Sequence, residues 1–170
     1  MSDLYRELLI KRVPQPSDML KKAGMIVLTL MAAGAVIFTP WAAIALLVMG
    51  VLDYFFLPSF HLEYEYLYVN GELDVDKIIS KSKRKRAASY RMEDMEMIAP
   101  WHSHEMDYYR NGHKGKMTDF SSGRKDAKPY AMVYGGEKGT EIVLLELDQI
   151  ILEDIRRIAP RKVQVGVKHF

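Results

Sequence analysis

The sequence predicts a membrane-embedded helical hairpin followed by an α+β domain, in which about six or seven antiparallel strands form a barrel or sandwich that ends in one helix. Two observations carry this prediction. Residues 23–52 contain no charged side chain. After residue 62, apolar and polar side chains alternate with a period of two, which is typical of half-buried strands. The part beyond the apolar segment is long enough to bury a core of its own.

The apolar segment is too long for one membrane helix and is interrupted near its middle. At about 1.5 Å per residue, a helix of about 30 residues would measure about 45 Å, against a hydrocarbon core of about 30 Å. Thr39 and Pro40 lie near the midpoint, and proline suits the first turn of a helix. We therefore expect two short transmembrane spans over residues 20–57. A single kinked span and a buried pair of helices are the alternatives.

Basic residues flank the apolar segment on both sides, and the turn between the two expected spans has none. The positive-inside rule then puts both flanks, and with them both termini, in the cytoplasm. We therefore expect a multi-pass protein of the cell membrane. The flanking basic residues are Lys11, Arg12, Lys21 and Lys22 before the segment, and Lys77, Lys81, Lys83, Arg84, Lys85 and Arg86 after it.

Residues 1–19 form an N-terminal tail with two interpretations. Basic side chains lie between the apolar ones, which is compatible with an amphipathic helix on the membrane surface. Pro14 and Pro16 would end that helix. A partly ordered tail is the alternative. The apolar residues concerned are Leu4, Leu8, Leu9 and Val13.

The β-domain is expected over residues 62–160, followed by a C-terminal tail over residues 161–170. Asn70-Gly71 separates two alternating runs and is a strong hairpin signal, so residues 62–69 and 72–79 should pair antiparallel. Residues 102–115 should form a loop. Asp148 should cap a helix that ends at Ile158. Further strands are expected near residues 87–92, 92–99, 116–121, 129–134 and 140–147.

Antiparallel strands followed by a capping helix describe a pleckstrin-homology-like (PH-like) barrel. Around these elements the chain carries the two apolar runs and the stretches Leu62-Glu63-Tyr64-Glu65-Tyr66, Asn70-Gly71-Glu72-Leu73-Asp74, Tyr90-Arg91-Met92-Glu93-Asp94-Met95 and Arg157-Ile158-Ala159-Pro160. With these features the sequence resembles a family of small uncharacterised bacterial membrane proteins over residues 20–160. The resemblance implies a helical hairpin followed by a PH-like domain. It implies no activity and no catalytic residues.

A run of basic residues is the sharpest electrostatic feature of the chain. Close to a bilayer, each such charge gains about 1 kcal/mol from anionic lipid, so contact with the lipid surface is one interpretation. The alternative is a solvated loop that only enforces the topology. Nucleic acid is not expected as a partner, because the run lacks the interleaved aromatic residues of single-strand binding sites. The run comprises Lys81, Lys83, Arg84, Lys85 and Arg86.

Three histidines form a weaker candidate site, for a metal ion. His102 and His104 have the spacing that places two imidazoles on one side of a strand, and His113 could supply a third ligand. No further pattern supports the site, and we expect neither a metal nor another cofactor. The chain has no cysteine, which excludes disulfide bonds and thiolate metal sites.

Acidic residues line one side of the expected hairpin around Asn70-Gly71. Paired carboxylates can serve in acid–base catalysis, but a solvent face that meets the basic run across the strands is the favoured interpretation. The glycines near Lys138 lack the spacing of a phosphate-binding loop. The acidic residues are Glu63, Glu65, Glu72, Asp74 and Asp76.

These features predict a non-enzymatic, membrane-anchored interaction module on the cytoplasmic face. Its expected partners are the lipid bilayer, through anionic lipid, and a protein that the sequence does not identify. The alternatives are a structural subunit of a membrane complex and a metal-binding sensor or enzyme built on the loop of His102 and His104. The oligomeric state does not follow from the sequence.

Overall fold

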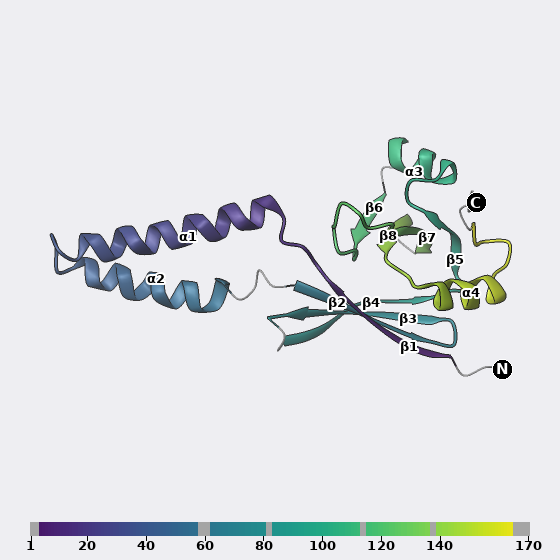
Figure 1. Ribbon diagram of the computed structural model, residues 1–170, viewed down its shortest axis with the longest axis horizontal. Helices are drawn as coiled ribbons and strands as arrows, with labels where there is room; N and C mark the ends of the chain where they lie inside the picture. Colours follow the sequence, from purple (N-terminus) through teal and green to yellow (C-terminus); the bar gives the residue numbers. More distant parts are fainter. Residues whose placement is uncertain (1–3, 58–61, 81–82, 113–114, 137–138, 165–170) are drawn as a thin grey trace.

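The computed structural model describes residues 4–57, 62–80, 83–112, 115–136 and 139–164. Two four-stranded sheets form the body of the protein, and a helical hairpin projects from one end of the first sheet (Figure 1). The helices are α1 Pro16–Ala35, α2 Ala42–Phe56, α3 Asp107–Gly112 and α4 Gln149–Ile158, with a short 3-10 helix, η2, at His104–Met106. The strands are β1 Tyr5–Lys11, β2 Leu62–Val69, β3 Glu72–Ile79, β4 Lys83–Arg91, β5 Met95–Pro100, β6 Lys116–Asp119, β7 Tyr130–Gly136 and β8 Gly139–Leu145.

The first sheet is an antiparallel meander in the order β1-β2-β3-β4. Its edge strand β1 precedes the hairpin in the chain and pairs along its whole length with β2. The amphipathic helix, which was one of the two interpretations of the N-terminal tail, is therefore wrong. Leu8 and Ile10 pack against the core, so the period of this segment is two. Leu9, which lies between them and is 50% exposed, obscures that period in the sequence.

The hairpin predicted around Asn70-Gly71 is confirmed. β2 and β3 pair from Leu62 opposite Ile79 to the turn. Asn70 and Gly71 have φ angles of 48° and 89°, the left-handed conformation that a tight two-residue turn between strands requires. The side chain of Asn70 also accepts a hydrogen bond from the backbone of Leu4, over 3.0 Å, and so ties the start of β1 to this turn.

The second sheet has the order β5-β7-β8-β6, and its strand β6 runs parallel to β8. The described residues thus form eight strands with one parallel pair, instead of the expected six or seven antiparallel strands. The loop expected at residues 102–115 is also wrong in part, because it contains η2 and α3. These short helices bring Met106 against Ala131 and Val133 and so cover the outer face of the second sheet.

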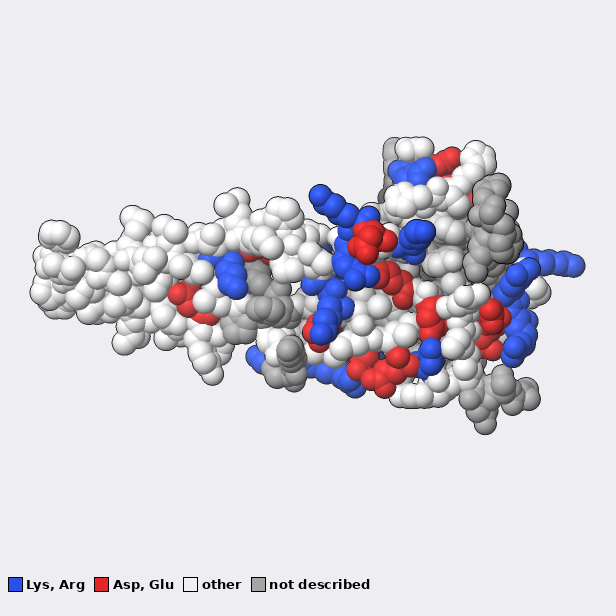
Figure 2. Space-filling view, viewed as in Figure 1, with Lys and Arg blue, Asp and Glu red and all other residues white. Residues whose placement is uncertain are grey.

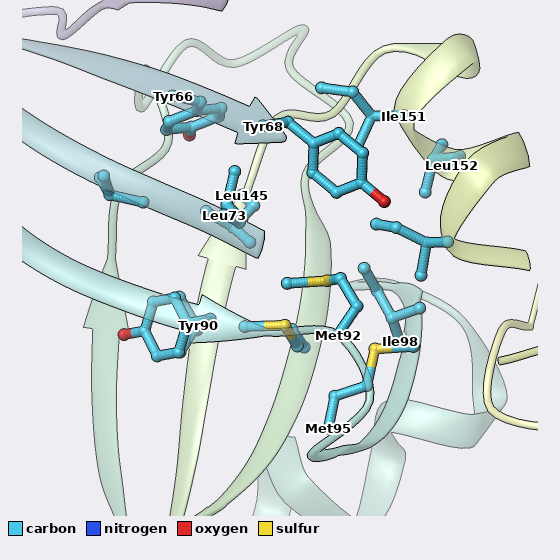
Figure 3. Packing of buried hydrophobic residues seen from close by; sticks show 14 of the residues in the cluster. Tyr66, Tyr68, Leu73, Tyr90, Met92, Met95, Ile98, Leu145, Ile151 and Leu152 are labelled. Atoms are coloured by element: carbon cyan, nitrogen blue, oxygen red, sulfur yellow. The ribbon is translucent and has the colours of Figure 1, made fainter. Parts of the chain in front are cut away.

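The main core lies between the two sheets, and α4 closes the end that is remote from the hairpin (Figure 1). In Figure 3, Tyr68 of β2 points toward Ile151 and Leu152 of α4. Tyr66 is fully buried as well, and its hydroxyl donates a 2.8 Å hydrogen bond to the carbonyl oxygen of Phe120. Buried tyrosines need such partners for their polar ends.

The predicted C-terminal helix is confirmed with its cap. Asp148 accepts a hydrogen bond from the backbone nitrogen of Ile151 over 2.9 Å, which satisfies one of the free donors at the start of α4. The chain after α4 returns to the second sheet. There the backbone nitrogen of Ile98 in β5 donates to Lys162, and Gln164 donates to Ile98, each over 2.8 Å. Part of the expected C-terminal tail therefore covers the edge of β5.

The predicted transmembrane hairpin is wrong. Among the described residues, no helix is both long enough and apolar enough to cross a membrane. The first two turns of α1 carry Asp18, Lys21 and Lys22, so that its uncharged part begins only at Ala23. α2 has 15 residues, or about 22 Å at 1.5 Å per residue, which is short of the bilayer core of about 30 Å. The two helices do form a hairpin, since α1 and α2 lie side by side (Figure 1).

Candidate functional site

The hairpin exposes more apolar side chain than any other element that the structure describes. No residue of α1 or α2 is buried. The far part of the hairpin is free of charged side chains in Figure 2. We call the following set the hairpin surface: Met19, Leu20, Ile26, Val27, Leu28, Leu30, Met31, Ile37, Phe38, Trp41, Ile44, Leu47, Val48, Val51, Leu52, Tyr54, Phe55 and Phe56, all large apolar side chains that are exposed.

The tip of the hairpin surface is its most exposed part. Ile37, Phe38 and Trp41 are 84%, 87% and 78% exposed, more than any other large apolar side chain in the described chain. The turn nevertheless has backbone hydrogen bonds of its own: the nitrogen of Phe38 donates to the carbonyl oxygen of Ala35 over 3.1 Å, and the nitrogen of Ala42 donates to that of Thr39 over 2.9 Å. The turn is therefore ordered by its own backbone, while its apolar side chains remain largely exposed.

One polar contact joins the two helices inside this apolar hairpin. The hydroxyl of Thr29 in α1 donates a 2.6 Å hydrogen bond to Oδ2 of Asp53 in α2, and the carbonyl oxygen of Met25 is a second acceptor within 3.1 Å. Oδ1 of Asp53 is shielded from solvent and has no hydrogen-bond partner among the described residues. The contact fixes how α1 lies against α2.

The predicted basic run divides between the two faces of the first sheet. Arg84 pairs with Glu65, and Arg86 lies 2.8 Å from Asp74 and 3.4 Å from Asp76. The prediction that the acidic hairpin face meets the basic run across the strands is therefore confirmed for these residues. Glu65 is only 7% exposed; burial raises the pKa of its carboxyl, and the Arg84 guanidinium opposes that rise.

The lysines of the run point to the opposite face. Lys85 lies directly opposite Lys77 of β3, and Lys83 lies directly opposite Ile79. Residues that face each other across a sheet share one side of it, and on β3 this is the side of Leu73 and the other core residues. No ion pair to these lysines is found in the described part of the chain. Lys81 lies outside the described residues.

The histidine candidates do not assemble. The side chain of His104 is 96% exposed and lies 2.8 Å from a carboxylate oxygen of Asp107, one helical turn away. His113 lies outside the described residues. Among the residues that the structure describes, no three metal-ligating side chains form a group that could hold a metal ion.

Two of the glycines near Lys138, Gly135 and Gly136, end β7. Gly136 pairs with Gly139, the first residue of β8, so these glycines belong to the junction of two strands. Residues 137 and 138 lie outside the described residues.

Sequence reasoning missed two features of the site: β1, whose alternation Leu9 obscures, and Lys77. The sequence spacing could have indicated Lys77, because it lies on the same side of its strand as Leu73 and Val75.

A protein-family model described as Bacterial PH-like domain (DUF6106) matches residues 2–165. No curated protein matches the chain. No solved structure matches it either. The match includes the segment that forms the helical hairpin as well as both sheets and α4.

Proposed function

Because the chain belongs to the bacterial PH-like domain family, we propose that it is a non-catalytic interaction module which the hairpin surface attaches to one side of a lipid bilayer. PH-like domains are generally non-catalytic and act as interaction modules. The exposure of Ile37, Phe38 and Trp41 at the tip is the observation that carries the attachment. In this proposal the hairpin enters the bilayer from the side of the β-domain and does not cross it.

The energetics favour lipid as the cover of the hairpin tip. Full burial of a side chain such as Ile37 or Phe38 gains about 1.5–3 kcal/mol over its exposure to water. Three such side chains at one end of the molecule, together with the rest of the hairpin surface, therefore give a large gain on transfer into lipid. Hydrogen bonds within each helix satisfy the backbone N–H and C=O groups in the interior of α1 and α2. These groups can therefore enter hydrocarbon without losing a hydrogen-bond partner.

The connection of the hairpin to the β-domain suits entry from one side. α1 follows β1 and α2 precedes β2, and these two strands are neighbours in the first sheet. The backbone nitrogen of Arg12 donates to the carbonyl oxygen of Leu62 over 3.1 Å, which holds the two feet of the hairpin together. The charged residues of α1, at Asp18, Lys21 and Lys22, lie at this foot and not at the tip. They would stay among the headgroups while the tip enters the acyl chains.

The depth of Trp41 in a bilayer tests the proposal. The chain has two tryptophans, so the variant Trp101→Phe leaves Trp41 as its single indole. With vesicles of phosphatidylcholine, we expect the emission of Trp41 to shift to the blue. Phosphatidylcholines brominated deep in the acyl chains should quench it more strongly than lipids brominated near the headgroup. Emission that no brominated lipid quenches would overturn the attachment.

A variant of the tip supplies the matched control. Ile37→Ser with Phe38→Ser, in the Trp101→Phe background, removes two apolar side chains from the turn and leaves the β-domain unchanged. It should lose the blue shift and float with vesicles much more weakly. The competing cover is a second copy of the chain. Sedimentation without lipid would then show concentration-dependent oligomers in which Trp41 is already shifted to the blue, and that result would contradict the lipid proposal.

A further inference from the structure

Two lysines of the first sheet face each other and have no ion-pair partner among the described residues. Lys77 of β3 lies directly opposite Lys85 of β4, and Lys83 belongs to the next pair on the same face. Like charges directly opposite each other in a sheet destabilise it. None of the three lysines has an ion pair among the described residues, whereas Arg84 and Arg86 on the other face have carboxylate partners. The arrangement is therefore complementary to an anion that binds on the face of the sheet that carries Lys77, Lys83 and Lys85, which we call the lysine face.

The position of these lysines identifies the kind of anion. Ile79, opposite Lys83, is also paired with Leu62. Leu62 accepts the hydrogen bond of Arg12 at the foot of the hairpin. The lysines therefore lie where the β-domain meets the hairpin, and Figure 2 shows basic side chains gathered in that region of the visible face. A bilayer that takes up the hairpin would bring its headgroups to this level.

We infer that Lys77, Lys83 and Lys85 form a site for the phosphate groups of anionic lipid headgroups. This inference rests on the proposed function, since the hairpin brings the headgroups to the site. It differs in one respect from the expectation based on the sequence, in which all the basic residues of the run contact lipid together. Arg84 and Arg86 stabilise the sheet through its acidic face, and Lys83 and Lys85 bind lipid together with Lys77 from the neighbouring strand.

Two double variants that remove equal charge from opposite faces test the inference. Lys83→Gln with Lys85→Gln changes the lysine face, and Arg84→Gln with Arg86→Gln changes the acidic face. The full chain is floated with vesicles of phosphatidylcholine alone or mixed with phosphatidylglycerol. Each lysine near an anionic surface contributes about fivefold to binding. The lysine variant should therefore bind the mixed vesicles about 25-fold more weakly than the wild type, and the arginine variant less than fivefold more weakly.

Neutral vesicles separate failure of this inference from failure of the hairpin attachment. If the wild type binds neither kind of vesicle, the attachment fails and the lysine site fails with it. If it binds both kinds and the lysine variant keeps the preference for mixed vesicles, the lysine site alone is overturned. Equal losses in both variants would also overturn it, because they would indicate net charge and not a site. Inorganic phosphate in excess should compete only weakly with the vesicles for the protein. A chloride solution of the same ionic strength is the control for this measurement. If phosphate displaces the vesicles much more strongly than chloride does, the site binds a soluble phosphate ligand and the assignment to lipid is overturned.

Loss of the ion pairs could unfold the arginine variant, so a second control is needed. Arg156→Gln with Arg161→Gln removes the same charge from exposed positions in and after α4, at the end remote from the hairpin (Figure 1). It should bind mixed vesicles within about twofold of the wild type. A loss as large as that of the lysine variant would contradict the site.

Discussion

The hydroxyl of Tyr68 in β2 donates a 2.9 Å hydrogen bond to a carboxylate oxygen of Asp154 in α4. Tyr68 is fully buried and Asp154 is only 8% exposed. A carboxylate in such a place is costly unless donors satisfy it. The other oxygen of Asp154 lies 3.6 Å from the guanidinium of Arg157, one turn further along the helix. The tyrosine thus joins the C-terminal helix to the first sheet through a polar contact within an otherwise apolar core.

Removal of this hydroxyl should destabilise the fold more than removal of a comparable one. Tyr68→Phe leaves Asp154 without its buried donor and should lower the free energy of unfolding by about 1–3 kcal/mol, measured by urea denaturation at pH 7. Tyr66→Phe is the control with uncharged partners, since the Tyr66 hydroxyl donates to the carbonyl oxygen of Phe120 and accepts a longer bond, over 3.3 Å, from the backbone nitrogen of Glu146. Equal losses in the two variants would show that the charge of Asp154 contributes nothing to the contact.

Alkaline pH should destabilise the protein through its buried tyrosines, since burial raises the pKa of Tyr64 as well as the pKa values of the three tyrosines that follow. Burial raises the pKa of the hydroxyls of Tyr66, Tyr68 and Tyr90 well above the usual value; the hydrogen bond to Asp154 adds to the effect for Tyr68, and the charge of Glu141 for Tyr90. The unfolded chain releases these protons near pH 10 and the folded chain retains them, so stability is complete below about pH 10 and falls as the pH rises further. These three protons alone should contribute a loss of about 4 kcal/mol per pH unit.

Denaturant midpoints between pH 8 and pH 11.5 would measure this loss. Tyr90→Phe should reduce the slope of stability against pH by about 1.4 kcal/mol per pH unit, because one proton no longer contributes. Tyr108→Phe is the control, since Tyr108 is 72% exposed, and it should leave the slope unchanged. A flat profile up to pH 11 would contradict the burial of these hydroxyls.

Asp148 has two roles that different substitutions separate. It caps α4 through the backbone of Ile151, and its Oδ2 lies 2.9 Å from the guanidinium of Arg6 in β1. Asp148→Ala should remove both contacts and cost about 1–2 kcal/mol in the free energy of unfolding. Asp148→Ser keeps a capping oxygen and should recover most of that loss, because the pair with Arg6 is only partly buried and contributes less than the cap. No recovery in the serine variant would indicate that the pair with Arg6 dominates.

The ion pair between Arg84 and Glu65 predicts that replacement of Arg84 lowers the free energy of unfolding by an amount that depends on pH. Arg84→Gln should lower the stability at pH 7 by about 1–2 kcal/mol, because Glu65 then ionises in a buried position without its partner. The pKa of Glu65 is already raised by burial, and loss of the guanidinium raises it further. A raised pKa contributes stability that is present at low pH and lost as the pH rises, so the variant should be closer to the wild type at pH 4 than at pH 7. The reverse order would contradict the assigned partner.

The sequence predicts the strands around Asn70-Gly71 and the capped C-terminal helix because local rules determine them. The turn needs two residues that tolerate positive φ, and the helix needs an oxygen at its start; both signals are explicit in the chain. The parallel pairing of β6 with β8 depends on contacts between segments far apart in sequence. The same holds for β1, which pairs with β2 across the intervening residues 12–61.

The arrangement of the candidate site likewise depends on pairing between strands, which the sequence does not determine locally. Alternation along β4 predicts that Lys83 and Lys85 share a face, but the choice between the faces depends on the register. That register shifts between Val75 and Asp76, where the sheet has an irregularity. The uncharged segment predicted a hairpin correctly and a membrane crossing wrongly. The sequence shows only the total length of the apolar stretch. Whether a helix can cross a bilayer depends on the number of apolar residues in each helix, and the turn and the charged first turns of α1 reduce that number.

Within the hairpin, the contact between Thr29 and Asp53 should control how α1 and α2 pack. Thr29→Val is nearly isosteric and removes the donor to Oδ2 of Asp53, whose Oδ1 already lacks a partner in the described part of the chain. The variant should lose about 1–3 kcal/mol of protection against hydrogen exchange in the amides of both helices. Amides of β2 and β3 should be unaffected, because they belong to the sheet.

A double-mutant cycle shows whether the loss arises from this contact. Asp53→Ala removes the buried carboxylate, and in that background Thr29→Val should cost less than about 0.5 kcal/mol, because no acceptor on α2 remains unsatisfied. The cycle is measured by hydrogen exchange of the full chain, with and without phosphatidylcholine vesicles. The interaction energy should be larger with vesicles, because an unpaired carboxylate costs more where water is excluded. Additive losses in both media would show that the two side chains act independently and that the hairpin is held by apolar packing alone.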